Sequence, residues 1–139
     1  IGDSPTYDWE VATQKKLTGI NYRRSLVKAK EVLDGLSHTY LVGEKYLNPD
    51  RYADGRDDGD NEGLFTGYAN NHSRNTLRAP LVDTPGFPST CQFGSIHAGI
   101  FHMALADGSV HGVSYEIDAK VHQNLGNRRD GVIAIDSPF

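Results

Sequence analysis

The densest group of candidate metal ligands in the sequence lies between residues 54 and 62. Six side chains with oxygen donors fall within this segment: Asp54, Asp57, Asp58, Asp60, Asn61 and Glu62. Calcium takes about six to eight oxygen ligands, which closely spaced carboxylates in a glycine-containing loop can supply. The spacing is not that of an EF-hand, because the twelfth position counted from Asp54 is Phe65 rather than a glutamate. We predict a calcium-binding loop, and the alternative is a solvated acidic loop whose repulsion is offset by Arg51, Arg56 or Lys45.

Histidine is the second residue type that can bind a metal, and the chain has six: His38, His72, His97, His102, His111 and His122. His102 and His111 flank an Asp-Gly turn, and counting outward from that turn places both on one face of a hairpin. Two imidazoles hold a metal only with a third ligand, which the spacing does not supply, and the His-Glu-x-x-His pattern is absent. Partly exposed sheet histidines are therefore the favoured interpretation.

No residue pattern in the sequence is typical of an enzyme. His97 and Asp107 together with a serine would suggest a catalytic triad, but a Gly-x-Ser-x-Gly elbow is missing and Asp107 has a sufficient role in a turn. Cys91 lies in a polar loop and is interpreted as a small loop thiol. Phosphate-loop and dinucleotide-binding motifs are absent as well. We expect no enzyme, and a hydrolase that uses His97 or His102 is the least favoured alternative.

The elements that must position these residues near the C-terminus are a hairpin and a helix. Residues 101–105 and 110–115 alternate between apolar and polar positions, as paired strands do. Asp107-Gly108 between them favours a type I′ turn, so we predict a β-hairpin. Residues 118–126 predict a short helix, with an aspartate N-cap at its start and an αL glycine cap at its end.

Earlier in the chain the patterns are weaker. Residues 37–47 predict a strand, and residues 64–68 predict a short one. Residues 21–34 fit either a helix or a strand followed by a helical turn. Residues 50–92 are rich in Asp, Asn, Pro and Gly and predict a long loop region, which in a compact domain is usually functional or held in place by contacts.

Composition limits the class of protein. The chain has 139 residues, of which 15 are glycine, and this favours one domain rich in strands and turns. No apolar run approaches the ~18 residues of a transmembrane helix. The net charge of −4 argues against a nucleic-acid partner, and a single cysteine cannot form an internal disulfide.

Several blocks of the sequence resemble one known family. Phe93-Gly94-Ser95-x-His97-x-Gly99 leads to Asp107-Gly108, an H-x9-DG pattern with nine residues between the histidine and the aspartate. Four further blocks match in order: Asp34-Gly35-x-Ser37-x-Thr39, Leu41-Val42-Gly43-Glu44-Lys45-Tyr46-Leu47, Asp58-Gly59-Asp60-Asn61-Glu62 with Thr66-Gly67-Tyr68, and Leu125-Gly126-Asn127-Arg128. Over residues 18–135 the chain resembles the DUF1559 family, which is abundant in planctomycetes.

The resemblance implies a pilin-like protein. Family members typically begin with a type IV prepilin-like leader and a long hydrophobic helix, so we expect this chain to be the C-terminal part of a longer protein. Some pseudopilins of type II secretion bind calcium in a C-terminal loop, which supports the calcium prediction. Family members commonly carry Asn at the position of His102. The motif residues, interpreted as structural, are Gly43, Glu44, Gly94, Ser95, His97, Gly99, Asp107 and Gly108.

These expectations combine into one interpretation. We predict a single α+β domain over residues 1–139, rich in antiparallel sheet, with a C-terminal hairpin followed by a short helix. The expected function is structural: the exported head of a pilin-like or pseudopilin-like protein of the cell envelope, periplasmic or extracellular, which assembles with other copies or related subunits.

The alternative function is an extracellular glycan- or ligand-binding module that uses the 50–90 loop region. Its sugar-contacting residues would be Tyr52, Phe65, Tyr68 and Asn70. We expect calcium as the only cofactor and no nucleic-acid partner. Contact with a membrane is expected only through an N-terminal helix outside this chain.

Overall fold

The described regular structure consists of short strands, single-turn 3-10 helices and a seven-residue α-helix. The computed structural model describes residues 17–69, 71–132 and 139. Its elements in chain order are η1 (Ala29–Glu31), η2 (Leu36–His38), β1 (Tyr40–Gly43), η3 (Pro49–Arg51), η4 (Leu64–Thr66), β2 (Leu81–Val82), β3 (Gly94–Ser95), β4 (Ile100–Leu105), β5 (Val110–Ser114) and α1 (Ala119–Leu125), where η denotes a 3-10 helix.

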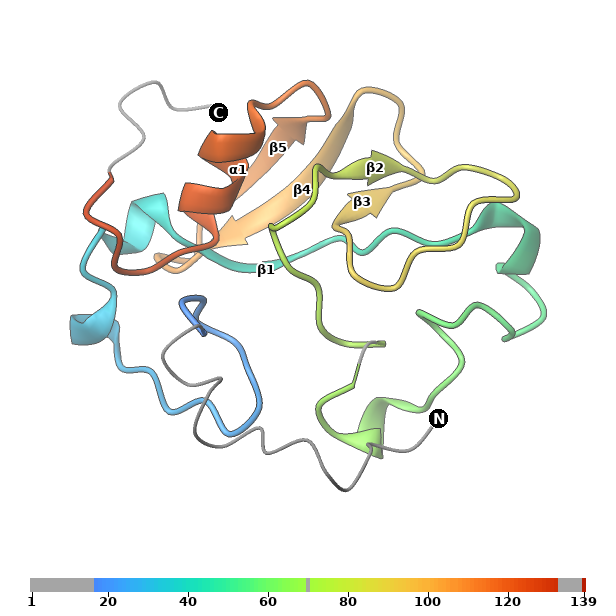
Figure 1. Ribbon diagram of the computed structural model, residues 1–139, viewed down its shortest axis with the longest axis horizontal. Coiled ribbons are helices and arrows are strands. Elements are labelled where there is room, and N and C mark those ends of the chain that lie inside the picture. Colours follow the sequence, from blue (N-terminus) through green and yellow to red (C-terminus); the bar gives the residue numbers. More distant parts are fainter. Residues whose placement is uncertain (1–16, 70, 133–138) are drawn as a thin grey trace.

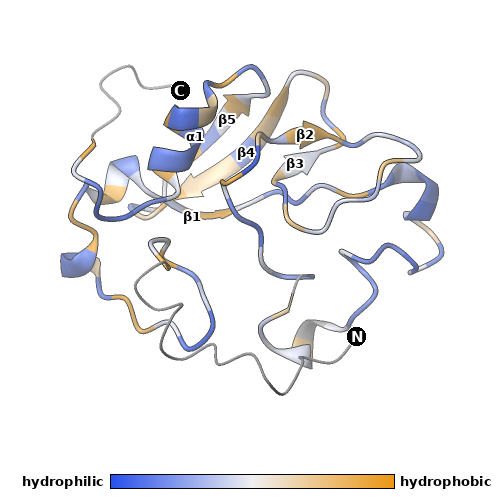
Figure 2. Cartoon of the chain, viewed as in Figure 1, coloured by the Kyte–Doolittle hydropathy of each residue, from blue (hydrophilic) through white to orange (hydrophobic). Residues whose placement is uncertain are grey.

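An antiparallel sheet of three strands in the order β1-β4-β5 forms the centre of the molecule. β2 and β3 form a separate parallel pair, and α1 lies against β4 and β5 (Figure 1). The fold is therefore α+β and dominated by antiparallel sheet, as predicted. Figure 2 shows apolar residues gathered on the strands, whereas α1 and the long loops are largely hydrophilic. Within the described part of the chain, no helix is long and apolar enough to span a membrane.

The predicted hairpin is present as β4 and β5, but its turn differs from the expected type. Leu105 N donates to Ser109 O (2.9 Å) and Gly108 N donates to Leu105 O (3.0 Å), so the loop has three residues. Within this turn only Gly108 has a positive φ, 90°, whereas a type I′ turn needs two such residues. Asp107 accepts bonds from the main-chain N–H and the hydroxyl of Ser109 (2.9 and 2.7 Å), which stabilises this alternative turn.

The three-residue loop shifts the strand register by one position from the prediction. Ala104 pairs with Val110 and Met103 pairs with His111, while His102 lies opposite Gly112. Because side chains alternate between the two faces of a sheet, His102 and His111 point to opposite faces. The prediction that these two imidazoles share one face is therefore wrong.

Of the two caps predicted for α1, the one at the start is confirmed and the one at the end is wrong. Asp118 is the N-cap, as predicted, and accepts bonds from Lys120 N (2.8 Å) and Val121 N (3.0 Å). Gly126 follows the helix with φ −80°, so the predicted αL cap is wrong. A Cβ at Gly126 would overlap the side chain of Thr76, and this close approach explains the glycine.

The face of the central sheet that meets α1, called the inner face below, carries the hydrophobic core. The buried cluster consists of Tyr40, Phe101, Met103, Leu105, Val113 and Leu125. Phe93 and Val121 pack against its margin. Burial of these side chains supplies the main driving force for folding of the sheet and helix together.

The opposite face of the sheet, called the outer face below, carries exposed side chains from all three strands. Val42, Ala104 and Val110 lie side by side across β1, β4 and β5. The next row contains Glu44, whose main-chain N–H donates to His102 O (3.0 Å) just beyond the end of β1. Val42 and Val110 are 53% and 65% exposed. This face therefore presents an apolar row beside a polar one.

Elsewhere the described structure departs from several expected elements. The strand predicted over residues 37–47 is shortened to β1 and an isolated bridge between Lys45 and Phe93. The short strand predicted at residues 64–68 is wrong, because the 3-10 helix η4 occupies this segment. Residues 21–34 contain η1 rather than a longer helix or a strand. These segments are short because local turn bonds, rather than sheet pairing, satisfy their main chain.

The long loop region is held to the sheet by a few buried side chains. Tyr46 is fully buried, and its hydroxyl donates to the carbonyl of Thr84 (2.9 Å). Gln92 is also buried and donates through its amide to Ala79 O (2.7 Å). These bonds tie residues far apart in the sequence to the segments next to β1 and β3, so the predicted loop region is ordered by contacts.

Candidate functional site

Glu44, His97 and His102 come together on the outer face of the sheet. Among the described residues, they are the one group of three or more acidic, histidine or cysteine side chains whose ligand-type atoms all lie within 4.8 Å of one another. Glu44 follows β1, His102 lies in β4, and His97 lies in the loop between β3 and β4. Their side chains are 35%, 50% and 43% exposed in the order Glu44, His97 and His102, so the group is accessible from solvent.

The carboxylate of Glu44 lies between the two imidazoles. Its Oε2 accepts a bond from the main-chain N–H of His102 (2.7 Å) and lies 3.1 Å from Nδ1 of the same residue. Its Oε1 lies 3.5 Å from Nε2 of His97. The two imidazole rings meet edge to face, with centroids 5.3 Å apart and an interplanar angle of 90°. Each oxygen of the carboxylate therefore faces a different histidine.

Sheet register positions two of these three residues. Gly43 pairs with Met103, so Glu44 lies opposite His102 as the two strands continue. Met103 points into the core, and the alternation of side chains then directs His102 to the outer face. Packing explains the glycine at position 43, because a Cβ there would overlap the side chain of Met103.

A polar network around Ser95 positions the third residue. The hydroxyl of Ser95 accepts a bond from His97 N (3.1 Å) and lies 3.0 Å from the hydroxyl of Tyr115. Tyr115 also receives a bond from Ser95 N (2.9 Å) and donates to Ser95 O (3.1 Å). Gly99 then turns the chain back into β4 with φ 92°. The loop therefore holds His97 beside β4, where its ring meets that of His102.

Electrostatics favour the charged form of the central carboxylate. Partial burial acts to raise the pKa of Glu44, but the bonds from His102 and the charges of His102 and His97 outweigh it. The pKa of Glu44 therefore lies below its ordinary value. An ionised carboxylate beside two imidazoles can hold a cation or accept a proton.

The structure assigns new neighbours to several residues singled out in the sequence. Glu44, one of the motif residues, accepts a bond from the main-chain N–H of His102. Asp107 serves the turn, as expected. His111 lies on the inner side of the hairpin near the hydroxyl of Ser109 (2.9 Å). The sequence did not predict the grouping of Glu44, His97 and His102, although Glu44 and His97 both belong to the motif blocks.

The acidic loop is arranged differently from the histidine group. Asp54 forms an ion pair with Arg51 (2.8 Å), which lowers the pKa of Asp54, and Asp60 forms one with Lys45. These two cations are among those expected to offset the loop's repulsion. Arg56 contributes its main-chain N–H to Asp54 (2.9 Å).

Asp57 is the buried member of the acidic loop. Its carboxylate accepts bonds from Asn48 N (2.8 Å) and Gly59 N (2.7 Å), so it organises the loop's main chain. The amide of Asn71 donates to Asn61 Oδ1 (3.4 Å). Calcium binding by Asp54, Asp57, Asp58, Asp60, Asn61 and Glu62 stays a prediction.

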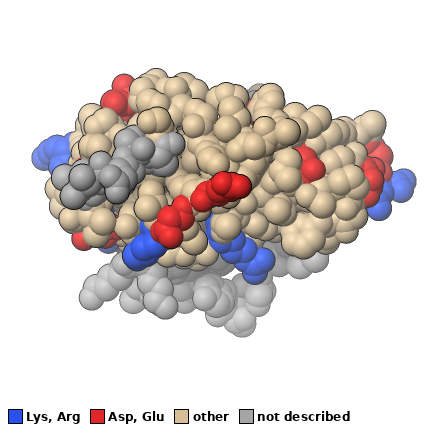
Figure 3. All heavy atoms as spheres, turned by 90° about the horizontal axis from the view of Figure 1, so that it is seen from above, with Lys and Arg blue, Asp and Glu red and all other residues tan. Residues whose placement is uncertain are grey.

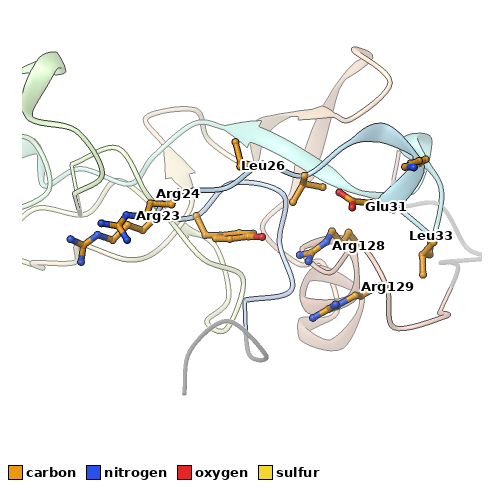
Figure 4. A pocket seen from close by; sticks show the side chains of 10 residues that line it. Arg23, Arg24, Leu26, Glu31, Leu33, Arg128 and Arg129 are labelled. Atoms are coloured by element: carbon orange, nitrogen blue, oxygen red, sulfur yellow. The ribbon is translucent and has the colours of Figure 1, made fainter. Parts of the chain in front are cut away.

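A separate hollow of about 500 Å³ lies beside η1 (Figure 4). Half of its ten lining residues are basic: Arg23, Arg24, Lys30, Arg128 and Arg129. Arg128 is buried and donates to the carbonyls of Leu17 (3.0 Å) and Gly19 (2.6 Å), so it braces the chain there. None of the sequence-predicted site residues lines this hollow.

Comparison with known proteins identifies the family. A family model described as "Protein of unknown function (DUF1559)" matches residues 1–120. No curated protein and no solved structure matches the chain. The matched range includes Glu44, His97 and the Asp107-Gly108 turn. Because the match covers most of the chain, this protein belongs to the DUF1559 family.

Proposed function

We propose that the chain is the exported globular head of a pilin-like or pseudopilin-like envelope protein, which assembles with copies of itself or related subunits. Membership of the DUF1559 family supports this class of protein. The observation that carries the proposal is the row of Val42, Ala104 and Val110 on the outer face of the sheet, in which both valines are more than half exposed.

This row gives a partner a continuous apolar strip to cover. Val42, Ala104 and Val110 are adjacent across the strands, so their side chains form one surface rather than scattered spots. Large apolar side chains gathered on an open face mark interaction sites in soluble domains. Ile100 lies on the same face of β4, beyond the row that contains His102, and is 40% exposed.

The edge of the sheet offers a second means of contact. β5 pairs with β4 on one side and lies at the margin of the described sheet. An edge strand can add a strand from another subunit through its main-chain groups. Seen from above, the surface is mostly uncharged, and its basic and acidic side chains lie beside one another rather than in a patch of one sign (Figure 3).

Sedimentation equilibrium of the chain, with Val110→Lys and Leu77→Lys variants, tests this proposal. Leu77 is a matched control because it is also exposed but lies near α1, where its carbonyl accepts from Gln123. We expect wild type and Leu77→Lys to associate as concentration rises, and Val110→Lys to associate at least tenfold more weakly, a loss of about 1.4 kcal/mol. A wild-type chain that is monomeric up to about 1 mM, or equal loss in both variants, contradicts the proposal.

A glycan-binding module is the second candidate, and exposed aromatic residues favour it. Phe65 is 98% exposed on η4, and Tyr52 and Tyr68 are about half exposed in the same loop region. Aromatic rings of this kind can stack on sugars. Asn70, the fourth residue predicted for this surface, lies outside the described residues. Saturable binding of a soluble saccharide that is lost in Phe65→Ala but kept in Leu77→Ala would favour this candidate; no binding to any saccharide would remove it.

A further inference from the structure

We propose that Glu44, His97 and His102 bind one divalent transition-metal ion, of which zinc is the best fit, on the outer face of the sheet. The ligands are a carboxylate oxygen of Glu44, Nε2 of His97 and Nδ1 of His102. The fourth position faces solvent and takes a water molecule. This proposal is independent of subunit assembly.

The donor atoms already have spacings close to those of a metal site. Zinc bonds of about 2.0–2.2 Å in a tetrahedron place neighbouring ligand atoms about 3.4 Å apart. The observed separations between Glu44 oxygens and the imidazole nitrogens are 3.1 Å to His102 and 3.5 Å to His97. Small side-chain rotations therefore suffice for three ligands to surround one ion.

The surrounding structure holds these ligands in place. His102 lies within a paired strand, and its main-chain N–H bonds to Glu44 Oε2. His97 is fixed through Ser95, whose hydroxyl and main chain bond to Tyr115. Ligands oriented by other hydrogen bonds in this way lose less conformational freedom when they bind a metal.

The ligand types select the class of ion. Two imidazoles and one carboxylate are typical of zinc sites with an open position, whereas calcium and magnesium prefer sets made of oxygen atoms. Imidazole ligands likewise suit other transition metals. The affinity of a site for different divalent metals follows a general order, and the coordination geometry of the site modifies that order. The site therefore excludes calcium by its nitrogen ligands and leaves the acidic loop as the oxygen-rich candidate.

The alternative is a simple ion-pair group in which Glu44 stabilises protonated histidines. Half-exposed pairs of this kind contribute little to stability, typically under about 1 kcal/mol. A metal would instead bind the neutral imidazoles, so it competes with protons for both rings and its binding weakens in acid. Metal titration at two pH values separates the two cases.

Isothermal titration of chelator-treated protein with zinc chloride tests the proposal. We expect one zinc ion per chain at pH 7.5, weaker binding at pH 5.5, and a dissociation constant raised at least about tenfold in Glu44→Gln, His97→Ala and His102→Asn. His97→Ala keeps the test decisive if another variant fails to fold, because His97 is exposed in the loop between β3 and β4. Circular dichroism of each variant checks its fold.

Two control variants test other side chains that could bind zinc. His111→Asn removes a histidine from the opposite side of the same hairpin, and Cys91→Ser removes the single thiol. Both should bind zinc as wild type does. Absence of zinc binding by wild type, full binding in folded His97→Ala, or loss of binding in either control would overturn the proposal.

Discussion

The two faces of the central sheet place histidines in opposite environments. Against the inner face, His122 of α1 is fully buried, and neither of its ring nitrogens has a hydrogen-bond partner among the described residues. Its ring packs against those of Tyr40, Phe93 and Phe101 at centroid distances of 5.5, 6.1 and 6.0 Å. On the outer face, His97 and His102 are about half exposed and share the carboxylate of Glu44.

This difference shows that environment decides what a histidine does. Burial without a partner disfavours the charged imidazole, and it lowers the pKa of His122 to about 4. The inner histidine therefore serves as an apolar ring in the core. The outer histidines meet an ionised carboxylate and solvent, which is the setting of a metal ligand or a proton acceptor.

The largest expected effect comes from titration of His122. Its pKa is about 6.5 in the unfolded chain and about 4 in the folded one, so the unfolded state binds more protons between these values. The contribution of neutral His122 is fully present above about pH 6.5 and decreases as pH falls to about 4, by about 3 kcal/mol. Urea unfolding at pH 7, 5.5 and 4 measures this loss.

A His122→Leu variant tests the assignment, because leucine fits an apolar site and does not titrate. We expect the dependence of its unfolding free energy on pH to be flatter than that of wild type. His72→Asn, at an exposed position, should keep the wild-type slope. If the unfolding free energy changes equally with pH in wild type and His122→Leu, the buried imidazole of His122 is not the source of the pH dependence.

Elements with strong local signals could be predicted from the sequence. The sheet face of a side chain could not be predicted where it depends on strand register. The hairpin and the Asp118 cap depend on neighbouring residues and were predicted correctly. Whether His111 shares a face with His102 depends on the number of residues in the turn, which Asp107 helps to set through its bonds to Ser109. A shift of one residue moved His102 away from His111.

The histidine group could not be predicted because it joins three segments. Glu44 and His102 meet only through the pairing of β1 with β4, and His97 joins them through the Ser95 network. The acidic residues of the 54–62 loop are close in sequence, yet Asp54, Asp57 and Asp60 bond to separate neighbours. Proximity in sequence and convergence in space are thus different properties in this chain.

Calcium binding by the acidic loop would add a metal site formed by residues other than Glu44, His97 and His102. At a calcium concentration about 100 times its dissociation constant, the folded state should gain about 2.7 kcal/mol. Thermal unfolding in calcium and in excess chelator measures this gain. Glu44→Gln should keep the calcium effect while Asp58→Asn reduces it. An unchanged midpoint in wild type would remove the calcium prediction.

Two adjacent residues of β1 provide a direct comparison of the faces. A Cβ at Gly43 would overlap the side chain of the buried Met103, so Gly43→Ala should cost about 2 kcal/mol of unfolding free energy. Val42 is exposed on the outer face, so Val42→Ala should change this free energy by about 0.5 kcal/mol or less. Denaturant midpoints of both variants check this, and similar losses would contradict the difference in packing.

The smallest expected effect concerns Tyr115, a positioning residue for His97. Tyr115→Phe removes the hydroxyl that bonds to Ser95, which should lower stability by about 1 kcal/mol and weaken zinc binding. Tyr68→Phe, at an exposed position, is the control. Titration with zinc distinguishes a role in positioning His97 from a role in the fold alone. An unchanged affinity for zinc in Tyr115→Phe would mean that the bonds between Tyr115 and Ser95 support only the fold.

The most direct test of the outer-face site is a crystal of the chain soaked in zinc and measured at the zinc absorption edge. We predict one anomalous peak about 2.0–2.2 Å from His97 Nε2, His102 Nδ1 and a Glu44 oxygen. A peak on His111, on Cys91 or in the acidic loop with none beside Glu44 would contradict it.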